Sequence, residues 1–405
     1  TAGIDATAGA HDLDRIARAS VVVASPGVPP DAAPLAAARA AGVTIVSEIE
    51  VALHALAGVR YIAVTGTNGK TTTTALIGHL LRVLGHRVAD AGNIGTPLTE
   101  IALREEKPGW IALELSSFQL HDTPSVDPAV GVLTNLSPDH LDRYASADEY
   151  YADKALLFRN ATDRSTWVLN ADDPLVTAMA AGVAGAHRGF GIVHDDAEMT
   201  FEPDSTGGEI RWNGARVVAR SELPLIGNHN VMNAMAASLA VIAADPAHAT
   251  KGALARIADG LRSFRAPPHR LEMVGERGGV LWINDSKATN VNSTLVAIQG
   301  MTRPTVLLLG GRHKGEPYTA LASDLHRVGR AVIAYGESAP IIEQDLDSVV
   351  RVERMGSDFA DVVARARDLA HPGDVVLLSP ACSSYDMFRN YEERGAAFRR
   401  LAVLT

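Results

Sequence analysis

A strand, a glycine loop and a helix that follow one another around residue 66 constrain the fold of this chain most. The apolar run 61–64 predicts a buried strand, and the loop then reads Gly66-Thr67-Asn68-Gly69-Lys70-Thr71-Thr72. A helix is predicted next, because apolar residues recur on one helical face at Leu76, Ile77, Leu80, Leu81 and Leu84. Such a loop cradles phosphate: backbone N–H groups take the anion, Lys70 takes outer phosphate charge, and Thr71 can hold magnesium. The full P-loop pattern has a glycine at the position of Val64, so the match is imperfect.

Composition places the chain among ordinary globular proteins and argues against two kinds of partner. Of its 405 residues, 47% are hydrophobic and 21% are charged, so it can bury the cores of two or three domains. The formal charge of -10 argues against nucleic-acid binding, which needs a basic surface, and no apolar run reaches the length of a membrane span. The single cysteine, Cys382, is consistent with a reducing cytoplasm.

The order of predicted elements indicates three α/β blocks, at residues 1–58, 59–266 and 267–405. In the first block, a helix from about residue 32 lies between strands at 21–24 and 44–46, which is the pattern of a βαβ unit. The block ends near residue 58, where the phosphate-loop strand of the second block is about to begin.

The second and third blocks predict doubly wound parallel sheets. After the phosphate loop, the second block has strands at 110–115 and 129–135. Alternating residues around Asn213-Gly214 then signal a hairpin, so a small antiparallel sheet is expected there. The third block interleaves helices with strands, which are predicted at 280–283, 306–309, 331–335 and 374–378.

Polar residues follow three strands of the second block and predict a metal site. The phosphate loop follows one strand, Glu114 closes another, and Asp139-His140 lies just beyond a third. Ligands of open α/β sheets bind at the carboxyl ends of strands, so we expect these groups to meet. A carboxylate and an imidazole beside a phosphate loop are suitable ligands for magnesium and its waters. The pattern therefore indicates a magnesium site at Thr71, Glu114 and His140.

A series of motifs along essentially the whole chain resembles the Mur ligases. In order, the motifs are the loop 66–72, Asn93-Ile94-Gly95, 114–120, 139–143, His229-Asn230, Pro268-His269-Arg270, 284–290 and Ser379-Pro380-Ala381-Cys382. The resemblance implies a three-domain architecture: a remnant of the UDP-substrate-binding domain at 1–58, a P-loop ATPase-like domain at 59–266 and a Rossmann-like domain at 267–405. The first βαβ unit of the family's N-terminal domain is missing from this sequence.

The strings Glu-Leu-Ser-Ser-Phe-Gln-Leu at 114–120 and Asp-Ser-Lys-Ala-Thr-Asn at 285–290 are similar to the family member that adds D-glutamate. That resemblance implies an ATP-dependent ligase of peptidoglycan precursor synthesis. The γ-phosphoryl of ATP would move to the carboxylate of UDP-N-acetylmuramoyl-L-alanine, and the amine of D-glutamate would attack the acyl phosphate. Catalysis would then consist mainly of positioning and charge neutralisation.

The same resemblance assigns roles to individual residues. The implied catalytic residues are Lys70, Glu114, His140 and Lys154, and the implied metal ligands, for two magnesium sites, are Thr71, Glu114, His140 and Lys154. The implied ATP-binding residues are Gly66, Thr67, Asn68, Gly69, Lys70, Thr71, Thr72, Asn230, Asn233, Arg270 and Asp285. Lys154 matches the carbamylated lysine of the family. An ammonium would repel magnesium, whereas a carbamate is an anionic oxygen donor.

Substrate residues are implied in all three blocks. On the side of the nucleotide sugar they are Ser25, Gly27, Asn93, Ser116 and Gln119. On the side of D-glutamate they are Thr289, Lys314, Ser384, Tyr385 and Tyr391, a set whose cation and hydroxyls suit a dicarboxylate. A monomer is expected.

Two other functions stay open at this point. A related amide ligase of the folylpolyglutamate synthase type shares the phosphate loop and the carbamylated lysine, although the strings at 114–120 and 285–290 argue against it. A nucleotide-binding fragment without turnover is the other alternative, because of the missing first unit. The presence of Lys70, Glu114, His140 and Lys154 argues against it.

Overall fold

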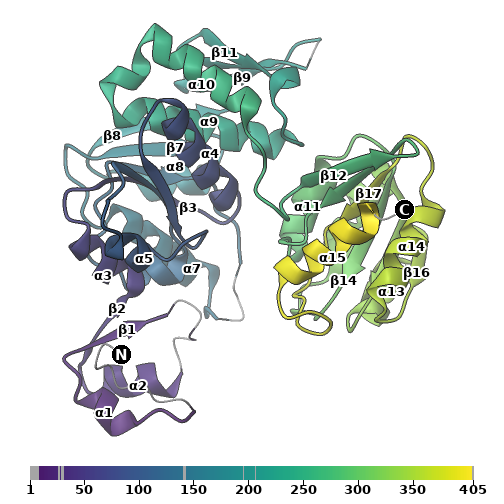
Figure 1. The fold of residues 1–405 in the computed structure, drawn as a ribbon, viewed down its shortest axis with the longest axis horizontal. Coiled ribbons are helices and arrows are strands. Elements are labelled where there is room, and N and C mark those ends of the chain that lie inside the picture. The colour runs from purple at the N-terminus through teal and green to yellow at the C-terminus, as the bar shows by residue number, and fades with distance from the viewer. Residues whose placement is uncertain are drawn as a thin grey trace. The chain divides into compact units, whose positions relative to one another are not determined.

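The computed structural model describes residues 9–25, 28, 32–139, 143–194, 196–205 and 207–403. The chain divides into two compact units, shown in Figure 1. The first unit comprises Thr1–Pro224 and Met232–Phe264, and the second comprises Leu225–Val231 and Arg265–Thr405. Each unit has its own hydrophobic core. The division near residue 265 falls next to the boundary that the sequence predicts at 266, while the three-domain boundaries themselves stay a prediction.

The first unit opens with the short βαβ segment that the sequence predicts. Its elements are α1 (Leu13–Ala17), β1 (Val21–Ala24), α2 (Ala33–Ala40), β2 (Thr44–Ser47) and α3 (Glu48–Ala55). The strands β1 and β2 pair in parallel, with Val21 opposite Thr44. The helix α3 follows β2 directly because Ser47 caps it, its Oγ accepting a hydrogen bond from the Glu50 N–H at 3.1 Å.

A nine-stranded sheet forms the centre of the first unit, in the order β11-β10-β9-β8-β7-β6-β3-β5-β4. In chain order its strands are β3 (Arg60–Thr65), β4 (Val88–Gly92), β5 (Trp110–Glu114), β6 (Val130–Leu133), β7 (Thr166–Asn170), β8 (Ala186–Gly191), β9 (Met199–Glu202), β10 (Glu209–Trp212) and β11 (Ala215–Ala219). All neighbours from β9 to β4 pair in parallel, and β9, β10 and β11 pair antiparallel. The predicted small antiparallel sheet is therefore continuous with the parallel sheet, which it joins where β9 pairs with β8.

The turn between β10 and β11 confirms the hairpin signal. Asn213 and Gly214 both have positive φ, 47° and 76°, which the two-residue hairpin turns that match strand twist require. Asparagine and glycine are the residues that adopt this backbone at least cost.

Helices on both faces complete the first unit. They are α4 (Lys70–Val83), α5 (Leu98–Leu103), α6 (Ser117–His121), α7 (Ala147–Ala155), α8 (Pro174–Ala180), α9 (Asn228–Ala244) and α10 (Lys251–Ser263), with 3-10 turns at Leu156–Phe158, Arg220–Glu222 and Pro246–Ala249. The apolar face predicted for α4 is buried: Leu76, Ile77, Leu80 and Leu81 are each 0% exposed. Helix α9 crosses the division between the units at Val231.

The order β6-β3-β5 decides where a ligand can bind in the first unit. The phosphate loop leaves β3, Glu114 ends β5, and the segment 134–139 follows β6. Because neighbouring parallel strands end at the same edge, the three predicted strand ends meet there.

The second unit contains a six-stranded sheet in the order β12-β13-β17-β14-β15-β16. Its strands are β12 (Glu272–Arg277), β13 (Val280–Asn284), β14 (Thr305–Gly310), β15 (Gly329–Tyr335), β16 (Val352–Arg354) and β17 (Val375–Leu378). Among the described strands of this six-stranded sheet, only β12 runs antiparallel to its neighbour. Its helices are α11 (Val291–Gln299), α12 (Ala322–Val328), α13 (Ala339–Leu346), α14 (Phe359–Leu369) and α15 (Tyr391–Val403), with a 3-10 turn at Tyr318–Leu321.

Alternation along the strands of the second unit confirms the doubly wound arrangement. Leu307 and Leu309 pack in one core cluster with residues of α11, α12 and α13. Val306 and Leu308 pack in another with residues of α14 and α15. Successive side chains of a strand point to opposite faces, so both faces of this sheet are covered by helices. No helix within the described ranges is long and apolar enough to cross a membrane.

Candidate functional site

The phosphate loop between β3 and α4 is built so that only glycine fits at two positions. Gly66 has φ 142°, and a Cβ there would lie 2.1 Å from Oγ1 of Thr134, which follows β6. Gly69 has φ 81° and caps α4, and a Cβ there would lie 2.3 Å from Oδ1 of Asn233 on α9. The loop backbone therefore packs closely against Thr134 and Asn233. The loop leads into the N-terminal end of α4, where an anion is favoured.

The other loop residues hold this backbone in place. Thr67 Oγ1 donates to the Ser137 carbonyl at 3.0 Å, and the Asn68 N–H donates to Asn135 Oδ1 at 2.8 Å. Thr71 and Thr72 are buried in the first turn of α4. The predicted magnesium residue Thr71 thus lies at the helix terminus, directly after Lys70.

Two lysines converge on one carbonyl of the loop. The Nζ of Lys70 donates to the Gly66 oxygen at 3.0 Å and to the Thr67 oxygen at 2.7 Å. The Nζ of Lys154, on α7, donates to the same Gly66 oxygen at 2.7 Å. Lys154 is only 1% exposed, and it lies 4.4 Å from the ring centroid of Tyr150. Burial, and then the nearby Lys70 ammonium, hold the pKa of Lys154 well below its ordinary value, which favours a neutral amine.

Glu114 presents an unused carboxylate oxygen beside the loop. Its Oε1 accepts a hydrogen bond from Asn93 Nδ2 at 2.9 Å. Its Oε2 is buried and finds no hydrogen-bond partner among the residues that the structure describes. A buried anionic oxygen without a donor is costly unless a cation or a water meets it, so Glu114 fits the predicted metal ligand.

The remaining predicted metal ligand, His140, lies outside the described residues, as does the predicted substrate residue Gly27. Among the described residues, no group of three or more histidine, cysteine, aspartate and glutamate side chains could hold a metal ion. The two predicted magnesium sites therefore stay a prediction.

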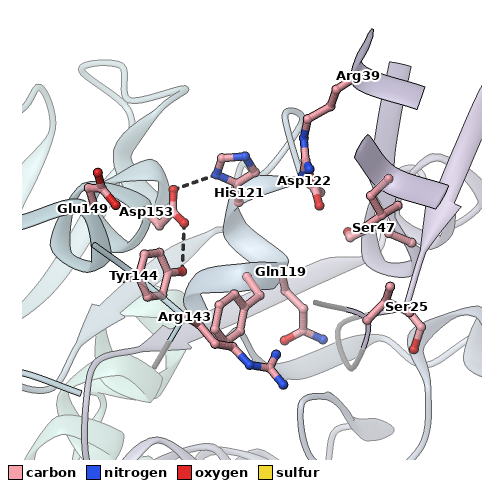
Figure 2. Close-up of a pocket in the computed structure, with 14 residues that line it drawn as sticks. Ser25, Arg39, Ser47, Gln119, His121, Asp122, Arg143, Tyr144, Glu149 and Asp153 are labelled. Atoms are coloured by element: carbon pink, nitrogen blue, oxygen red, sulfur yellow. Dashed lines mark hydrogen bonds and ion pairs between the residues drawn. The ribbon is translucent and has the colours of Figure 1, made fainter. Parts of the chain in front are cut away.

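A cavity of about 220 Å³ separates the N-terminal βαβ segment from α6 and α7 within the first unit (Figure 2). Ser25 and Ser47 lie on one side of it, and Tyr144 and Asp153 lie on the other. Two predicted substrate residues, Ser25 and Gln119, thus line one cavity although 94 positions separate them in the chain (119 − 25).

Much of this cavity is lined by side chains to which the sequence motifs assign no role. Phe118 and Tyr144 stack with their ring centroids 5.3 Å apart and an angle of 13° between their planes. The Arg143 guanidinium lies 5.3 Å from the centroid of the Phe118 ring. Asp153 accepts hydrogen bonds from the Tyr144 hydroxyl at 2.8 Å and pairs with His121 Nδ1 at 2.7 Å, and this pairing raises the pKa of His121. An aromatic pair with a cation suits an anionic ligand that carries a ring.

Ser116 and Gln119 have a structural role as well. The Ser116 Oγ accepts from the Gln119 N–H at 3.2 Å, and the Gln119 Oε1 accepts from the Ser116 N–H at 3.0 Å. This reciprocal pair is a capping box at the start of α6. The local signal was present in the sequence, because serine followed three residues later by glutamine is the pattern of such a cap.

In the second unit, Asp285 follows β13 and is fully engaged with its own unit. Its Oδ2 accepts from the Ser379 hydroxyl at 2.8 Å, and its Oδ1 accepts from the Leu271 N–H at 3.1 Å. Burial raises the pKa of Asp285 to about 7. Leu271 directly follows Arg270, so the contact joins the strand end to the turn that carries Arg270, another predicted ATP residue of this unit.

Four of the predicted D-glutamate residues, Thr289, Lys314, Ser384 and Tyr385, lie on loops at the carboxyl ends of β13, β14 and β17, which are adjacent strands of the sheet. Lys314 and Tyr385 are exposed, and Thr289 is half-buried. Ser384 is buried, and its hydroxyl has no hydrogen-bond partner in the described part of the chain. Tyr391 begins α15, and its carbonyl accepts from the Ser286 hydroxyl at 2.8 Å.

The division between the units also separates the two predicted asparagines of α9. Asn233 belongs to the first unit with the phosphate loop, and its Oδ1 accepts from the Thr73 hydroxyl at 3.3 Å. Asn230 belongs to the second unit, where its Nδ2 donates to the Ile226 carbonyl at 2.8 Å.

Two protein-family models match the middle and the C-terminal parts of the chain. The family model described as Mur ligase middle domain matches residues 64–241, and the model described as Mur ligase, glutamate ligase domain matches residues 269–382. The chain is 42% identical over 98% of its length to a UDP-N-acetylmuramoylalanine–D-glutamate ligase of Anaeromyxobacter dehalogenans, of which it covers 86%. It is 40% identical over 99% of its length to the enzyme of the same name from Salinibacter ruber, of which it covers 88%.

Solved structures show the same fold at low identity. The crystal structure of MurF ligase from Thermotoga maritima in complex with ADP superposes with a TM-score of 0.68 at 18% identity. The match covers 92% of each chain.

Proposed function

The chain belongs to the Mur ligase family, and we propose that it joins D-glutamate to UDP-N-acetylmuramoyl-L-alanine with hydrolysis of ATP. The observation that carries the proposal is the 42% identity, over 98% of the chain, to a ligase named for this reaction. Three features of the first unit also support the proposal: the phosphate loop, the buried Lys154, and the Glu114 Oε2, which has no hydrogen-bond partner among the described residues.

Activation of the acceptor carboxylate comes first in the proposed reaction. A carboxylate is a poor electrophile, so one of its oxygens attacks the γ-phosphorus of ATP and an acyl phosphate forms with loss of ADP. The N-terminus of α4 and the Lys70 ammonium neutralise phosphate charge that builds up in this step. The Lys70 ammonium donates to two carbonyls of the loop, from which it can turn to a bound phosphate.

Glu114 and Thr71 are the residues that would hold magnesium beside the phosphates. The partnerless Oε2 of Glu114 fits a hard cation, which prefers oxygen ligands. Bound magnesium supplies neutralisation of the phosphate oxygens. The Asn93 amide holds the second carboxylate oxygen and so orients the first.

Lys154 is proposed to act as a carbamate. Its lowered pKa favours the neutral amine, and a neutral amine can attack carbon dioxide and release a proton. The carbamate would supply anionic oxygen donors beside the phosphate loop.

The two substrates are assigned to different units. We place the nucleotide-sugar acceptor at the cavity of Figure 2, where Arg143 can meet phosphate and the rings of Phe118 and Tyr144 can meet the apolar faces of the ligand. We place D-glutamate at the loops that carry Thr289, Lys314, Ser384, Tyr385 and Tyr391. The amine then attacks the acyl carbon, a tetrahedral intermediate forms, and phosphate leaves.

A phosphate-release assay tests the proposal. Purified protein is given ATP, magnesium and UDP-N-acetylmuramoyl-L-alanine, with D-glutamate, L-glutamate or no amino acid. Release is expected with D-glutamate alone, and Lys70→Ala should abolish it while circular dichroism stays unchanged. Turnover with a folate acceptor would support the folylpolyglutamate-type alternative, and ATP binding without any turnover would support an inactive fragment.

The expected setting follows from the same proposal. ATP is consumed and the single cysteine fits a reducing compartment, so we assign the reaction to the cytoplasm, with the enzyme as a monomer.

A further inference from the structure

Arg394 is a buried cation that the proposed mechanism does not use. It lies in the first turn of α15 and is 0% exposed. No carboxylate forms an ion pair with it in the described part of the chain. A buried guanidinium carries a large desolvation cost, and the N-terminal end of a helix is the end that disfavours cations. Because burial and the helix dipole both disfavour this cation, other contacts must stabilise it.

The compensation comes from two carbonyl-rich loops and a strand end. The Nε of Arg394 donates to the Ser286 hydroxyl at 3.0 Å, and one Nη donates to the Ser286 carbonyl at 2.8 Å. Both Nη atoms donate to the Cys382 carbonyl at 3.2 Å, and one also reaches the Gly310 carbonyl at 3.4 Å. These acceptors stand at the carboxyl ends of β13, β17 and β14, which are neighbours in the sheet.

Arg394 packs so closely against the loop after β14 that a side chain at Gly311 would not fit. A Cβ on Gly311, whose φ is 131°, would lie 3.2 Å from Nη1 of Arg394 and 2.2 Å from the Ser383 carbonyl. The planar fork thus fixes the mutual placement of three chain segments, which the flexible point charge of a lysine could not do.

Every segment that Arg394 holds leads to a residue assigned to D-glutamate. Thr289 follows Ser286 by three positions, Ser384 follows Cys382 by two, and Lys314 follows Gly310 by four. The Ser286 hydroxyl, which accepts from Arg394, also donates to the carbonyl of Tyr391. The loops after β14 and β17 are also joined directly, because the Gly310 N–H donates to the Pro380 carbonyl at 3.0 Å and the Arg312 N–H donates to the Ser383 carbonyl at 2.9 Å. The Arg394 guanidinium adds the loop after β13 to this pair.

We propose that Arg394 is a positioning residue for the amino-acid substrate: it sets the three loops in their binding geometry, and its unpaired charge favours a dicarboxylate above them. The inference rests on the proposed function. It predicts an effect on D-glutamate affinity that exceeds any effect on ATP affinity or on folding.

The test compares four variants in the phosphate-release assay, with KM for D-glutamate, KM for ATP, kcat and the thermal transition measured for each. Arg394→Lys keeps the charge and loses the fork, and Arg394→Met loses both. Ser286→Ala removes one hydroxyl and keeps the arginine. Thr305→Ala is the matched control, since it removes a buried hydroxyl at the opposite end of β14, where Thr305 bonds only the Arg303 carbonyl.

In Ser286→Ala and Arg394→Lys, KM for D-glutamate should rise about tenfold or more, while KM for ATP changes by less than about threefold. Arg394→Met should be affected more than Arg394→Lys, and Thr305→Ala should keep the wild-type KM values. If Arg394→Met does not fold, the other two variants decide. An unchanged KM for D-glutamate in folded Ser286→Ala and Arg394→Lys would overturn the inference, as would equal increases in both KM values. Absence of D-glutamate-dependent turnover in the wild type would instead overturn the proposed function on which the inference rests.

Discussion

At the scale of single residues, burial sets the chemistry of this protein more than the presence of a charged group does. Lys154 and Asp285 are both almost fully buried, and burial shifts the pKa of each toward its neutral form. The sequence alone gives no reason to distinguish Lys154 from a solvated helix lysine, because its depth depends on the packing of α7 beneath the phosphate loop. Only the resemblance to a family singled it out.

Lys154→Ala should lower the rate of phosphate release to near background, because the variant lacks the oxygen donors that a carbamate would provide. Acetate at high concentration should restore part of the rate, since a small carboxylate fits the space that the side chain leaves. Removal of bicarbonate should slow the wild type but not the alanine variant. A fully active Lys154→Ala would show that the amine has no part in the reaction.

Asp285→Asn should remove a pH dependence of stability. The folded-state pKa of about 7 lies above the ordinary value of 3.8, so folding takes up a proton between these values and stability falls as pH rises through them. The loss is complete above pH 7 and amounts to roughly 4 kcal/mol. Asparagine keeps both hydrogen bonds, because the Ser379 hydroxyl can accept instead of donate.

Calorimetry at pH 4, pH 5 and pH 8 measures this effect. Asp285→Asn should unfold at a higher temperature than the wild type at pH 8 and nearly match it at pH 4. The exposed Asp368→Asn is the control and should follow the wild type at each pH. A wild-type transition of the second unit that does not weaken between pH 5 and pH 8 would contradict the assignment.

At the scale of elements, hydrophobic periodicity and turn chemistry predicted most of the fold. The strand before the phosphate loop, the apolar face of α4 and the Asn213-Gly214 hairpin are all local signals, and the structure confirms them. Side-chain contacts between residues far apart in the sequence were not predictable. The contacts of Asp153 with His121 and Tyr144, and of Arg394 with three strand ends, depend on tertiary packing that leaves no pattern along the chain.

Gly69→Ala should damage the phosphate loop selectively. Its left-handed backbone disfavours a side chain by about 1 kcal/mol, and its Cβ would collide with Asn233. Gly58→Ala is a matched control, since Gly58 has a similar φ of 87° and no atom within 4 Å of a Cβ. Gly69→Ala should lose at least as much stability as Gly58→Ala, because the collision adds to the backbone cost that both share. Only Gly69→Ala should weaken ATP binding, by about tenfold or more in calorimetric titration. Equal ATP affinity in the two variants would mean that the loop does not hold the nucleotide.

At the scale of the whole molecule, the predicted site residues are distributed over two compact units. The phosphate loop, Glu114, Asn93 and Lys154 belong to the first unit, whereas Arg270, Asp285 and the loops assigned to D-glutamate belong to the second. The sequence motifs identified these residues in chain order. The boundary predicted at 266 already separates these two groups. The division of α9, which assigns Asn230 and Asn233 to different units, became visible only in the structure.

The most direct measurement follows an oxygen atom through the reaction. UDP-N-acetylmuramoyl-L-alanine labelled with ¹⁸O in its alanyl carboxylate is incubated with the protein, ATP, magnesium and D-glutamate, and the products are analysed by mass spectrometry. The proposed ligase transfers a carboxylate oxygen to phosphorus, so the released phosphate should carry one ¹⁸O and the sugar product should gain one glutamyl residue. Unlabelled phosphate, or an acceptor that gains no D-glutamate, would contradict the proposed function.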